Sequence, residues 1–282
     1  MKDPAASALA HAAELLSGAN ALIVAAGAGM GVDSGLPDFR GREGFWRTYP
    51  ALLEAGLDFT EIASPTAFRT APERAWGFYG HRLALYRATR PHPGFGLLRH
   101  WGGRMLHGLS VFTSNVDGQF QLAGFDPAEV HECHGSIHHL QCLRPCCEAI
   151  WPAEAFVPEL DEAHCRLLNA PPLCPWCGGL ARPNILMFGD GGWVDQRSQA
   201  QAARQEAWLG RVTRPLVIEL GAGTAIPSVR RFSEQVIHAL GGRLVRINPT
   251  DCAVPTARDV GLKLGALEAL AALAALDAMT PG

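Results

Sequence analysis

The segment from residue 21 to residue 41 constrains this chain more than any other stretch of its sequence. It begins with an apolar run, Ala21 to Ala26, which has the length and composition of a buried strand. Gly27, Gly29 and Gly31 follow. Because glycine has no Cβ, its backbone can pack closely against another segment, and its N–H group can approach a phosphate. A strand that leads into a glycine turn is the usual opening of a nucleotide-binding fold.

Taken alone, this glycine pattern leaves two interpretations open. Val32 stands where the nucleotide-binding pattern G-x-G-x-x-G has its third glycine, so the segment can equally be a tight turn that binds no ligand. A polar loop, residues 33–40, follows the turn. Motifs elsewhere in the chain must therefore decide between the two interpretations.

The composition excludes several classes of protein. The chain has 282 residues, 48% of them hydrophobic, which suits one large domain or two small ones with a sizeable core. A net charge of −3 and a pI near 6.4 give no general attraction for nucleic acid or an anionic membrane, and we expect neither as a partner. The sequence contains no stretch of about 18 uncharged apolar residues for a transmembrane helix, and its start is a poor signal peptide. We therefore expect a cytoplasmic protein.

Apolar periodicity divides the chain into an α/β frame with two insertions. The frame alternates strands with helices and predicts a Rossmann-like, doubly wound parallel sheet. Its expected helices are residues 5–17, 229–240 and 265–278, and its expected strands are residues 21–26, 104–113, 130–133, 216–220 and 243–247. Residues 42–100 carry apolar and aromatic side chains at helical spacing and predict a helical insertion. Residues 141–182 have too little apolar periodicity to fold without an additional cross-link.

The cysteines of the second insertion can supply that cross-link by binding a metal ion. Cys174 and Cys177 are separated by two residues, the spacing of a zinc knuckle. Their partners are Cys142 with either Cys146 or the adjacent Cys147, and we prefer Cys146 because three intervening residues fall within the usual spacing. Four thiolates make a closed, structural zinc site. The other interpretation is a set of free thiols in a reducing compartment.

Polar residues follow two of the expected strands. Asn115 and Asp117 lie in the run Thr113-Ser114-Asn115-Val116-Asp117, at the carboxyl end of a strand, where open α/β sheets bind ligands. The run can also be an Asx-rich turn. His134 follows the next strand, and a histidine with a near-neutral pKa can take a proton from a hydroxyl. Composition does not choose it over its neighbours His131, His138 and His139.

Together these motifs resemble those of the sirtuins, the NAD-dependent protein deacylases. Residues 27–40, Gly-Ala-Gly-Met-Gly-Val-Asp-Ser-Gly-Leu-Pro-Asp-Phe-Arg, are similar to the family's first signature, with Met30-Gly31 in place of Ile-Ser. Residues 113–117 resemble its Thr-Gln-Asn-Ile-Asp signature, with Ser114 in place of glutamine. The resemblance rests on five ordered motifs between about residue 20 and residue 268.

The resemblance implies a role for each matching residue. His134, which precedes a glycine about twenty residues after the Asn-Val-Asp run, is the expected general base. Asn115 is expected to orient the nicotinamide ribose and a water, and Asp117 to hold the nicotinamide amide. Zinc is expected to be structural. The residues expected to bind NAD are Gly27, Ala28, Gly29, Asp38, Phe39, Arg40, Thr113, Ser114, Asn115, Asp117, Gly221, Ala222, Gly223 and Asn248.

Two segments are expected to bind the substrate. Residues 183–190, which contain Phe188 and Gly189, resemble the family's strand that pairs with an acyl-lysine peptide, with Asp190 in place of glutamate. Tyr79 and Arg82, three residues apart on an expected helix, can clamp a carboxylate. A Tyr-x-x-Arg pair does so in the sirtuin subgroup that removes succinyl and malonyl groups. The alternative is an aromatic core residue beside a surface arginine.

The resemblance implies an NAD-dependent protein-lysine deacylase that acts on acetyl-lysine or on succinyl- and malonyl-lysine proteins. The acyl oxygen attacks the nicotinamide ribose, nicotinamide leaves, and the acyl group passes to ADP-ribose. The implied domains are an NAD-binding domain of residues 1–41, 101–140 and 183–282, a helical module of residues 42–100 and a zinc module of residues 141–182. Ser114, Gly31 and Gly223 keep a second activity open, namely a mono-ADP-ribosyltransferase or NAD glycohydrolase. A non-catalytic NAD-sensing scaffold is the third hypothesis.

Overall fold

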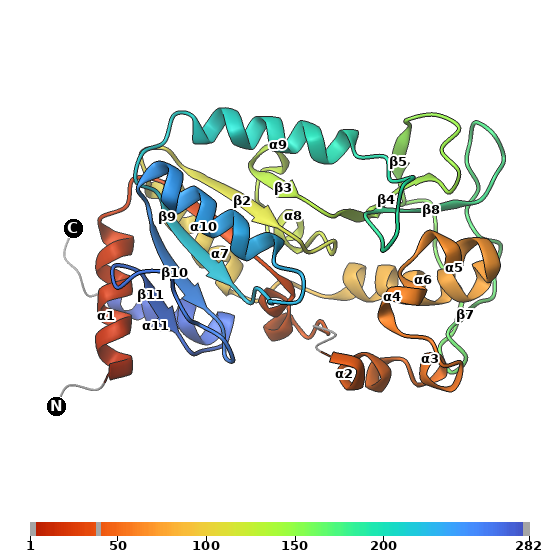
Figure 1. Cartoon of the computed structure of the whole chain (residues 1–282), viewed down its shortest axis with the longest axis horizontal. Coiled ribbons are helices and arrows are strands. Elements are labelled where there is room, and N and C mark those ends of the chain that lie inside the picture. Colours follow the sequence, from red (N-terminus) through yellow and green to blue (C-terminus); the bar gives the residue numbers. More distant parts are fainter. Residues whose placement is uncertain (1–3, 38–40, 279–282) are drawn as a thin grey trace.

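The structure, a computed structural model, describes residues 4–37 and 41–278 (Figure 1). Asp38, Phe39 and Arg40, which the resemblance assigns to the cofactor site, lie outside the described residues. The described chain forms a larger domain around a parallel sheet and a smaller domain at the carboxyl end of that sheet's strands (Figure 1).

The larger domain contains a six-stranded sheet in which all neighbouring strands are parallel. In spatial order its strands are β11 (Val260–Leu262), β10 (Arg243–Ile247), β9 (Leu216–Leu220), β1 (Leu22–Ala26), β2 (Leu109–Thr113) and β3 (Val130–Glu132). All residues of β1, β2 and β9 are buried, as expected for central strands that are covered on both faces. The predicted doubly wound α/β fold is confirmed.

Helices cover both faces of this sheet. One face is covered by α1 (Pro4–Ser17), α7 (Gly94–Arg104) and α11 (Ala266–Asp277), and the other by α9 (Gln196–Leu209) and α10 (Ser228–Leu240). Successive residues of β1 alternate between the two cores, since Leu22 and Val24 pack with the first set of helices and Ile23 and Ala25 with the second. None of the described helices has the length and apolar character needed to cross a membrane.

Helix α9 was not among the expected elements, because polar side chains occupy its buried face. Gln205 Nε2 donates to Ser110 Oγ over 2.9 Å, and Gln201 Oε1 accepts from the backbone N–H of Glu132 over 3.1 Å. Buried glutamines give no apolar period, so the segment carried no helical signal. Strand β11 was also unexpected, because three residues are too few to show a pattern.

The helical insertion forms most of the smaller domain's core. It contains α2 (Gly41–Thr48), α3 (Pro50–Glu54), α4 (Phe59–Ile62), α5 (Pro65–Thr70) and α6 (Pro72–Ala88). The expected end of the helical insertion, residue 100, does not coincide with the division between the two cores. Phe95, Leu98 and Trp101 of α7 lie in the core of the larger domain, and α7 continues to Arg104, so the strand that follows begins only at Leu109.

The second insertion adds a small antiparallel sheet to this domain. Its strands are β5 (Ile150–Pro152), β4 (Gly135–Cys142) and β8 (Ala181–Ile185), with a separate hairpin of β6 (Leu160–Asp161) and β7 (Arg166–Leu167). Ile137, Leu140 and Ile185 of this sheet pack into the same core as the helical insertion. The two insertions therefore share one core, although long stretches of sequence separate them.

The order of strands places a ligand site at the carboxyl edge of the larger sheet. The chain moves from β1 outward through β2 to β3, and later from β9 outward through β10 to β11, so the direction of winding reverses between β1 and β9. Open α/β sheets bind ligands at such a reversal. The short helices that follow β1 and β2 near this edge are η1 (Ala28–Met30), η2 (Val32–Ser34) and α8 (Gln119–Leu122), whereas η3 (Pro127–Glu129) leads into the amino end of β3.

Candidate functional site

Two glycine turns touch each other where the strand order reverses. The first, Gly27–Gly29, follows β1, and the second, Gly221–Gly223, follows β9. The N–H of Gly27 donates to Leu220 O over 3.0 Å, and the N–H of Gly29 donates to Gly221 O over 3.1 Å. Gly221 has a φ of +59°, and a Cβ on it would lie 2.3 Å from Gly29 Cα. These glycines are therefore required for the mutual packing of the turns, and the Gly29 N–H is used within the protein.

The end of β2 is tied to the first of these turns. Thr113 Oγ1 donates to Ala26 O over 2.9 Å and accepts from the backbone N–H of Asn115 over 3.0 Å. The side-chain amide of Asn115 donates to Gly27 O over 3.0 Å. Asn115, one of the expected catalytic residues, is thus held beside the glycine turn by both its backbone and its side chain.

Asp117 is a buried carboxylate two residues further along. Its Oδ1 accepts from the backbone N–H of Gln119 over 2.9 Å, and His138 Nε2 donates to its backbone carbonyl over 2.8 Å. The pKa of Asp117 is raised to about 6, mainly by burial and also by the charge of Glu132, while the Gln119 N–H and the charge of Arg82 oppose the rise. The carboxyl group therefore changes charge close to neutral pH.

His134 lies between β3 of the larger sheet and β4 of the smaller one. Burial lowers its pKa, and a hydrogen bond with the backbone of Ser114 acts in the opposite direction. Its ring is thus neutral at pH 7 and able to accept a proton. Its Nε2 lies 3.4 Å from Ser228 Oγ, at the start of α10. No sequence pattern marked Ser228.

The other histidines of this stretch have different surroundings. His131 Nδ1 lies 3.0 Å from Gln205 Oε1, in the packing between β3 and α9. His138 is engaged by the backbone of Asp117. The ring of His134 is the one that lies between the Ser114 backbone and the start of α10, beside the two turns.

Residues of the second glycine turn and of the segment after β10 lie together at the other end of the candidate cofactor site. The Ala222 carbonyl accepts a hydrogen bond from Asn248 Nδ2 over 3.0 Å. Asn248 is only 3% exposed. Gly223 is exposed, and a Cβ on it would meet open space, so a ligand can approach its backbone.

The expected peptide-binding segment leaves the smaller sheet after Ile185. Its continuation is irregular over residues 186–190, so the expected strand is shorter than the motif. The Leu186 N–H donates to His134 O, and the Phe188 N–H donates to Ala63 O, both over 3.0 Å. Phe188 is 37% exposed. The segment therefore presents partly exposed side chains directly beside His134.

A buried ion pair supports this segment. Arg182 Nη1 lies 2.7 Å from Asp190 Oδ2, and neither side chain is exposed. The same carboxylate accepts from the backbone N–H groups of Met187 and Gly192, over 3.2 and 3.1 Å. Gly189, inside this loop, has a φ of +64°. Asp190 thus holds the loop of residues 186–192 together through its bonds to Arg182, Met187 and Gly192. Its side chain is shorter than the glutamate of the family motif and reaches these nearby groups.

Tyr79 and Arg82 lie side by side on α6, inside the smaller domain. The Arg82 guanidinium carbon is 5.6 Å from the centre of the Tyr79 ring, and Arg82 Nε donates to the hydroxyl of Tyr86 over 3.0 Å. Both residues are buried, so Arg82 is not the surface arginine of the alternative interpretation.

Four cysteines of the second insertion form a candidate metal centre. The Sγ atoms of Cys142, Cys146, Cys174 and Cys177 all lie within 4.8 Å of one another. The Cys142–Cys177 and Cys146–Cys174 sulfur distances are 3.6 and 3.7 Å. A tetrahedral zinc ion with Zn–S bonds of 2.3 Å separates its sulfurs by about 3.8 Å, so this set fits structural zinc. The group includes Cys146 rather than Cys147.

We expect removal of this metal to destabilise the smaller domain, because the free energy of binding a structural metal is part of the free energy of folding. Cys174→Ser is predicted to abolish zinc binding in metal analysis and to lower the melting temperature by about 10 °C. Cys147→Ser, which changes an adjacent thiol outside the group, is the matched control. Equal zinc content and melting temperature in the Cys174→Ser protein would rule out the four-cysteine site.

Asp117→Asn is predicted to stabilise the protein in a pH-dependent way. The raised pKa means that ionised Asp117 disfavours folding, by an amount that grows as pH rises from about 4 to about 6 and is complete above that. The substitution should therefore increase the free energy of unfolding by about 1–3 kcal/mol at pH 8, and much less at pH 4.5. Urea titrations at both pH values measure this difference. Glu54→Gln, which alters an exposed carboxylate, is the matched control.

The chain matches the Sir2 family model over residues 27–208. It is 30% identical to "NAD-dependent protein deacylase 2" of Pyrobaculum aerophilum, over 92% of this chain and 92% of that protein. It is 32% identical to a "probable bifunctional ADP-ribose hydrolase/ADP-ribosyltransferase" of Fusarium oxysporum f. sp. cubense, over 85% of this chain but 42% of that protein. The crystal structure of a Sir2 homologue–NAD complex has the same fold, with a TM-score of 0.71, 24% identity and coverage of 95% of this chain and 93% of the other. This chain belongs to the Sir2 family.

Proposed function

We propose that this chain, an NAD-dependent protein deacylase, carries out its reaction with His134 as general base and with Asn115 and Asp117 at the nicotinamide end of the cofactor. One observation supports this assignment above all. Asn115 is bonded to the first glycine turn, and His134 and Asp117 lie beside it, where the strand order reverses. Relatives of similar length bear the name NAD-dependent protein deacylase.

The cofactor fits this edge of the sheet. The second turn has an exposed backbone at Gly223, and buried or partly buried polar groups surround the first turn. When bound, NAD supplies an electrophilic ribose carbon and nicotinamide as the leaving group. Asn115, held in place by Gly27 and Thr113, orients a ribose hydroxyl and a water. The ionised form of Asp117 accepts from the nicotinamide amide.

His134 takes the proton of the ribose hydroxyl. Its lowered pKa keeps the ring neutral and ready to accept that proton. The Ser114 backbone fixes one side of the ring, and Ser228 Oγ lies near the Nε2 on the other. A ring restrained on both sides loses little orientational freedom when the proton moves.

The acyl-lysine substrate is an extended peptide that pairs with residues 186–190 by β-augmentation. It donates to backbone carbonyls of this segment, because the N–H groups of Leu186, Met187 and Phe188 are bonded within the protein. The Leu186 N–H bonds to His134 O, so a peptide on this segment lies next to the general base. Phe188, which contacts Phe59 edge-on, forms an apolar wall beside the peptide, and Gly189 permits the turn that ends the pairing.

The acyl group we propose is negatively charged, with Tyr79 and Arg82 as its clamp. The charge of Arg82 lowers the pKa of Asp117, so the guanidinium acts electrostatically at the nicotinamide end of the site. A guanidinium and a phenol on one face of α6 match the geometry of a carboxylate. Succinyl- or malonyl-lysine would present that carboxylate, whereas acetyl-lysine would not.

A second candidate activity is transfer of ADP-ribose to a protein. The fungal relative whose name includes ADP-ribosyltransferase supports it, as does the exchange of the family's glutamine for Ser114. The two activities leave different products. Deacylation yields O-acyl-ADP-ribose and a lighter peptide, whereas transfer yields a peptide that is heavier by an ADP-ribose.

His134→Tyr is predicted to lower acyl removal at least about 100-fold while the protein remains folded, because the reaction loses its base. Nicotinamide release and mass spectrometry of the products, with acetyl- and succinyl-lysine peptides, measure the loss. His100→Tyr, on the exposed face of α7, is the control for the added ring. A His134→Tyr protein with the rate of the unaltered enzyme would remove His134 from the mechanism.

Arg82→Met is predicted to lower kcat/KM for the succinyl peptide at least about tenfold relative to that for the acetyl peptide, through loss of a charge-assisted hydrogen bond. The acetyl peptide serves as the internal control, since any general damage from changing a buried residue affects both substrates. Tyr79→Phe, which keeps the ring, should act in the same direction. If the unaltered enzyme prefers the acetyl peptide, Tyr79 and Arg82 are core residues and do not bind a carboxylate.

A further inference from the structure

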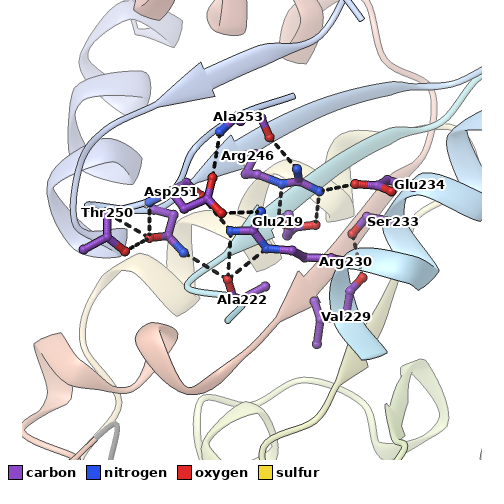
Figure 2. A network of polar contacts seen from close by, with 11 residues as sticks. Glu219, Ala222, Val229, Arg230, Ser233, Glu234, Arg246, Thr250, Asp251 and Ala253 are labelled. Carbon is purple, nitrogen blue, oxygen red and sulfur yellow. Dashed lines mark hydrogen bonds and ion pairs between the residues drawn. The ribbon is translucent and has the colours of Figure 1, made fainter. Parts of the chain in front are cut away.

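Arg230, the third residue of α10, takes part in neither the sequence motifs nor the proposed reaction. It is 9% exposed and lies between the second glycine turn and the segment that follows β10 (Figure 2). Burial of a guanidinium is costly unless its donors are satisfied. The hydrogen-bond partners of Arg230 therefore indicate its role in the structure.

Those partners belong to two separate segments. Arg230 Nε and Nη2 both donate to the Ala222 carbonyl over 3.2 Å. Nη2 also donates to the Asp251 carbonyl over 2.7 Å, and Nη1 lies 3.2 Å from Asp251 Oδ2. One planar side chain thus fixes the distance between the glycine turn and the Asp251 segment.

Asn248 strengthens the same connection. Its Nδ2 donates to the Ala222 carbonyl, and its Oδ1 accepts from the N–H and the hydroxyl of Thr250 over 3.0 and 2.9 Å and from the Asp251 N–H over 3.2 Å. The side-chain amide is therefore used within the protein. Asn248 and Arg230 act together on one carbonyl and one segment.

A second arginine holds this segment from the sheet beneath. Arg246 on β10 and Glu219 on β9 are register neighbours, and their side chains are joined by contacts of 2.6 and 3.2 Å (Figure 2). Arg246 Nη2 also bonds to Glu234 of α10 over 2.9 Å, and its Nη1 bonds to the Ala253 carbonyl. The segment around residues 251–253 is therefore fixed from two sides.

The carbonyl of Ala222 explains why this arrangement affects the cofactor. A carbonyl oxygen in a turn that receives a pyrophosphate repels it, whereas here the oxygen is bound by three donors. The Arg230 guanidinium also adds positive charge next to the turn that would receive the anionic pyrophosphate.

We propose that Arg230 is a positioning residue for the adenosine half of NAD. It holds the Gly221–Gly223 turn and the Asp251 segment in the relative position that receives the adenosine and its pyrophosphate. The inference rests on the proposed cofactor site. It assigns to Arg230 an effect on cofactor affinity and no part in the chemical step.

The test compares Arg230→Lys, which keeps the charge but loses the planar fork, with Arg230→Met, which loses both. Arg231→Met is the matched control, because Arg231 is its exposed neighbour on the same helix. Calorimetric binding of ADP-ribose is measured for each protein, together with kcat and KM for NAD and for the acyl peptide. ADP-ribose carries the adenosine and pyrophosphate and lacks nicotinamide, so its binding is tested independently of turnover.

Arg230→Lys should weaken ADP-ribose binding and raise KM for NAD about tenfold, and Arg230→Met more, because charge-assisted hydrogen bonds are lost. At saturating NAD, kcat should stay within about twofold, and KM for the peptide should not change. Unchanged ADP-ribose binding in both variants would overturn the proposal, as would an equal loss in Arg231→Met. A fall in kcat together with a similar rise in the KM values for both NAD and the peptide would show a merely structural role. An unaltered enzyme that bound ADP-ribose but removed no acyl group would refute the proposed function instead.

Discussion

The candidate site depends on one close contact, the packing of the Gly27–Gly29 turn against the turn at Gly221. The first turn ends β1 and the second ends β9, so their contact lies where the winding of the sheet reverses. A side chain on Gly27 or Gly221 would meet the opposite backbone at under 3 Å. Both turns need glycine for this reason, and the sheet then brings the proposed nicotinamide-side and adenosine-side residues to one edge.

From this contact the proposed nicotinamide end of the site extends along β2 and β3. Thr113 and Asn115 are bonded to the backbone of β1 and its turn, and His134 follows as the chain leaves the larger sheet for the smaller one. The connection from β3 to β4 is therefore also the junction between the domains. The general base of the proposed reaction lies between the larger sheet and the segment that we propose binds the peptide.

The smaller domain reaches its shape by different means. Its aromatic core joins two insertions that are distant in sequence, and the four-cysteine group ties the end of β4 to the knuckle before β8. The buried Arg182–Asp190 pair then closes the loop that would receive the peptide. Breaking such a pair by removing one partner would leave a buried charge without compensation, so the loop has little freedom to rearrange.

The sequence by itself determined the elements whose signals are local. Apolar runs predicted β1, β9 and β10, cysteine spacing predicted the metal group, and ordered motifs predicted Asn115, Asp117 and His134 as site residues. Tertiary structure decided what depends on residues far apart in the chain. Glutamines on α9 are buried against β2 and β3, Arg82 is enclosed by aromatic rings, and Ser228 lies beside His134. The same holds for Arg230 and Asn248, which meet at one carbonyl. A polar side chain carries no periodic signal when its partner lies on another element, because only the folded chain brings donor and acceptor together.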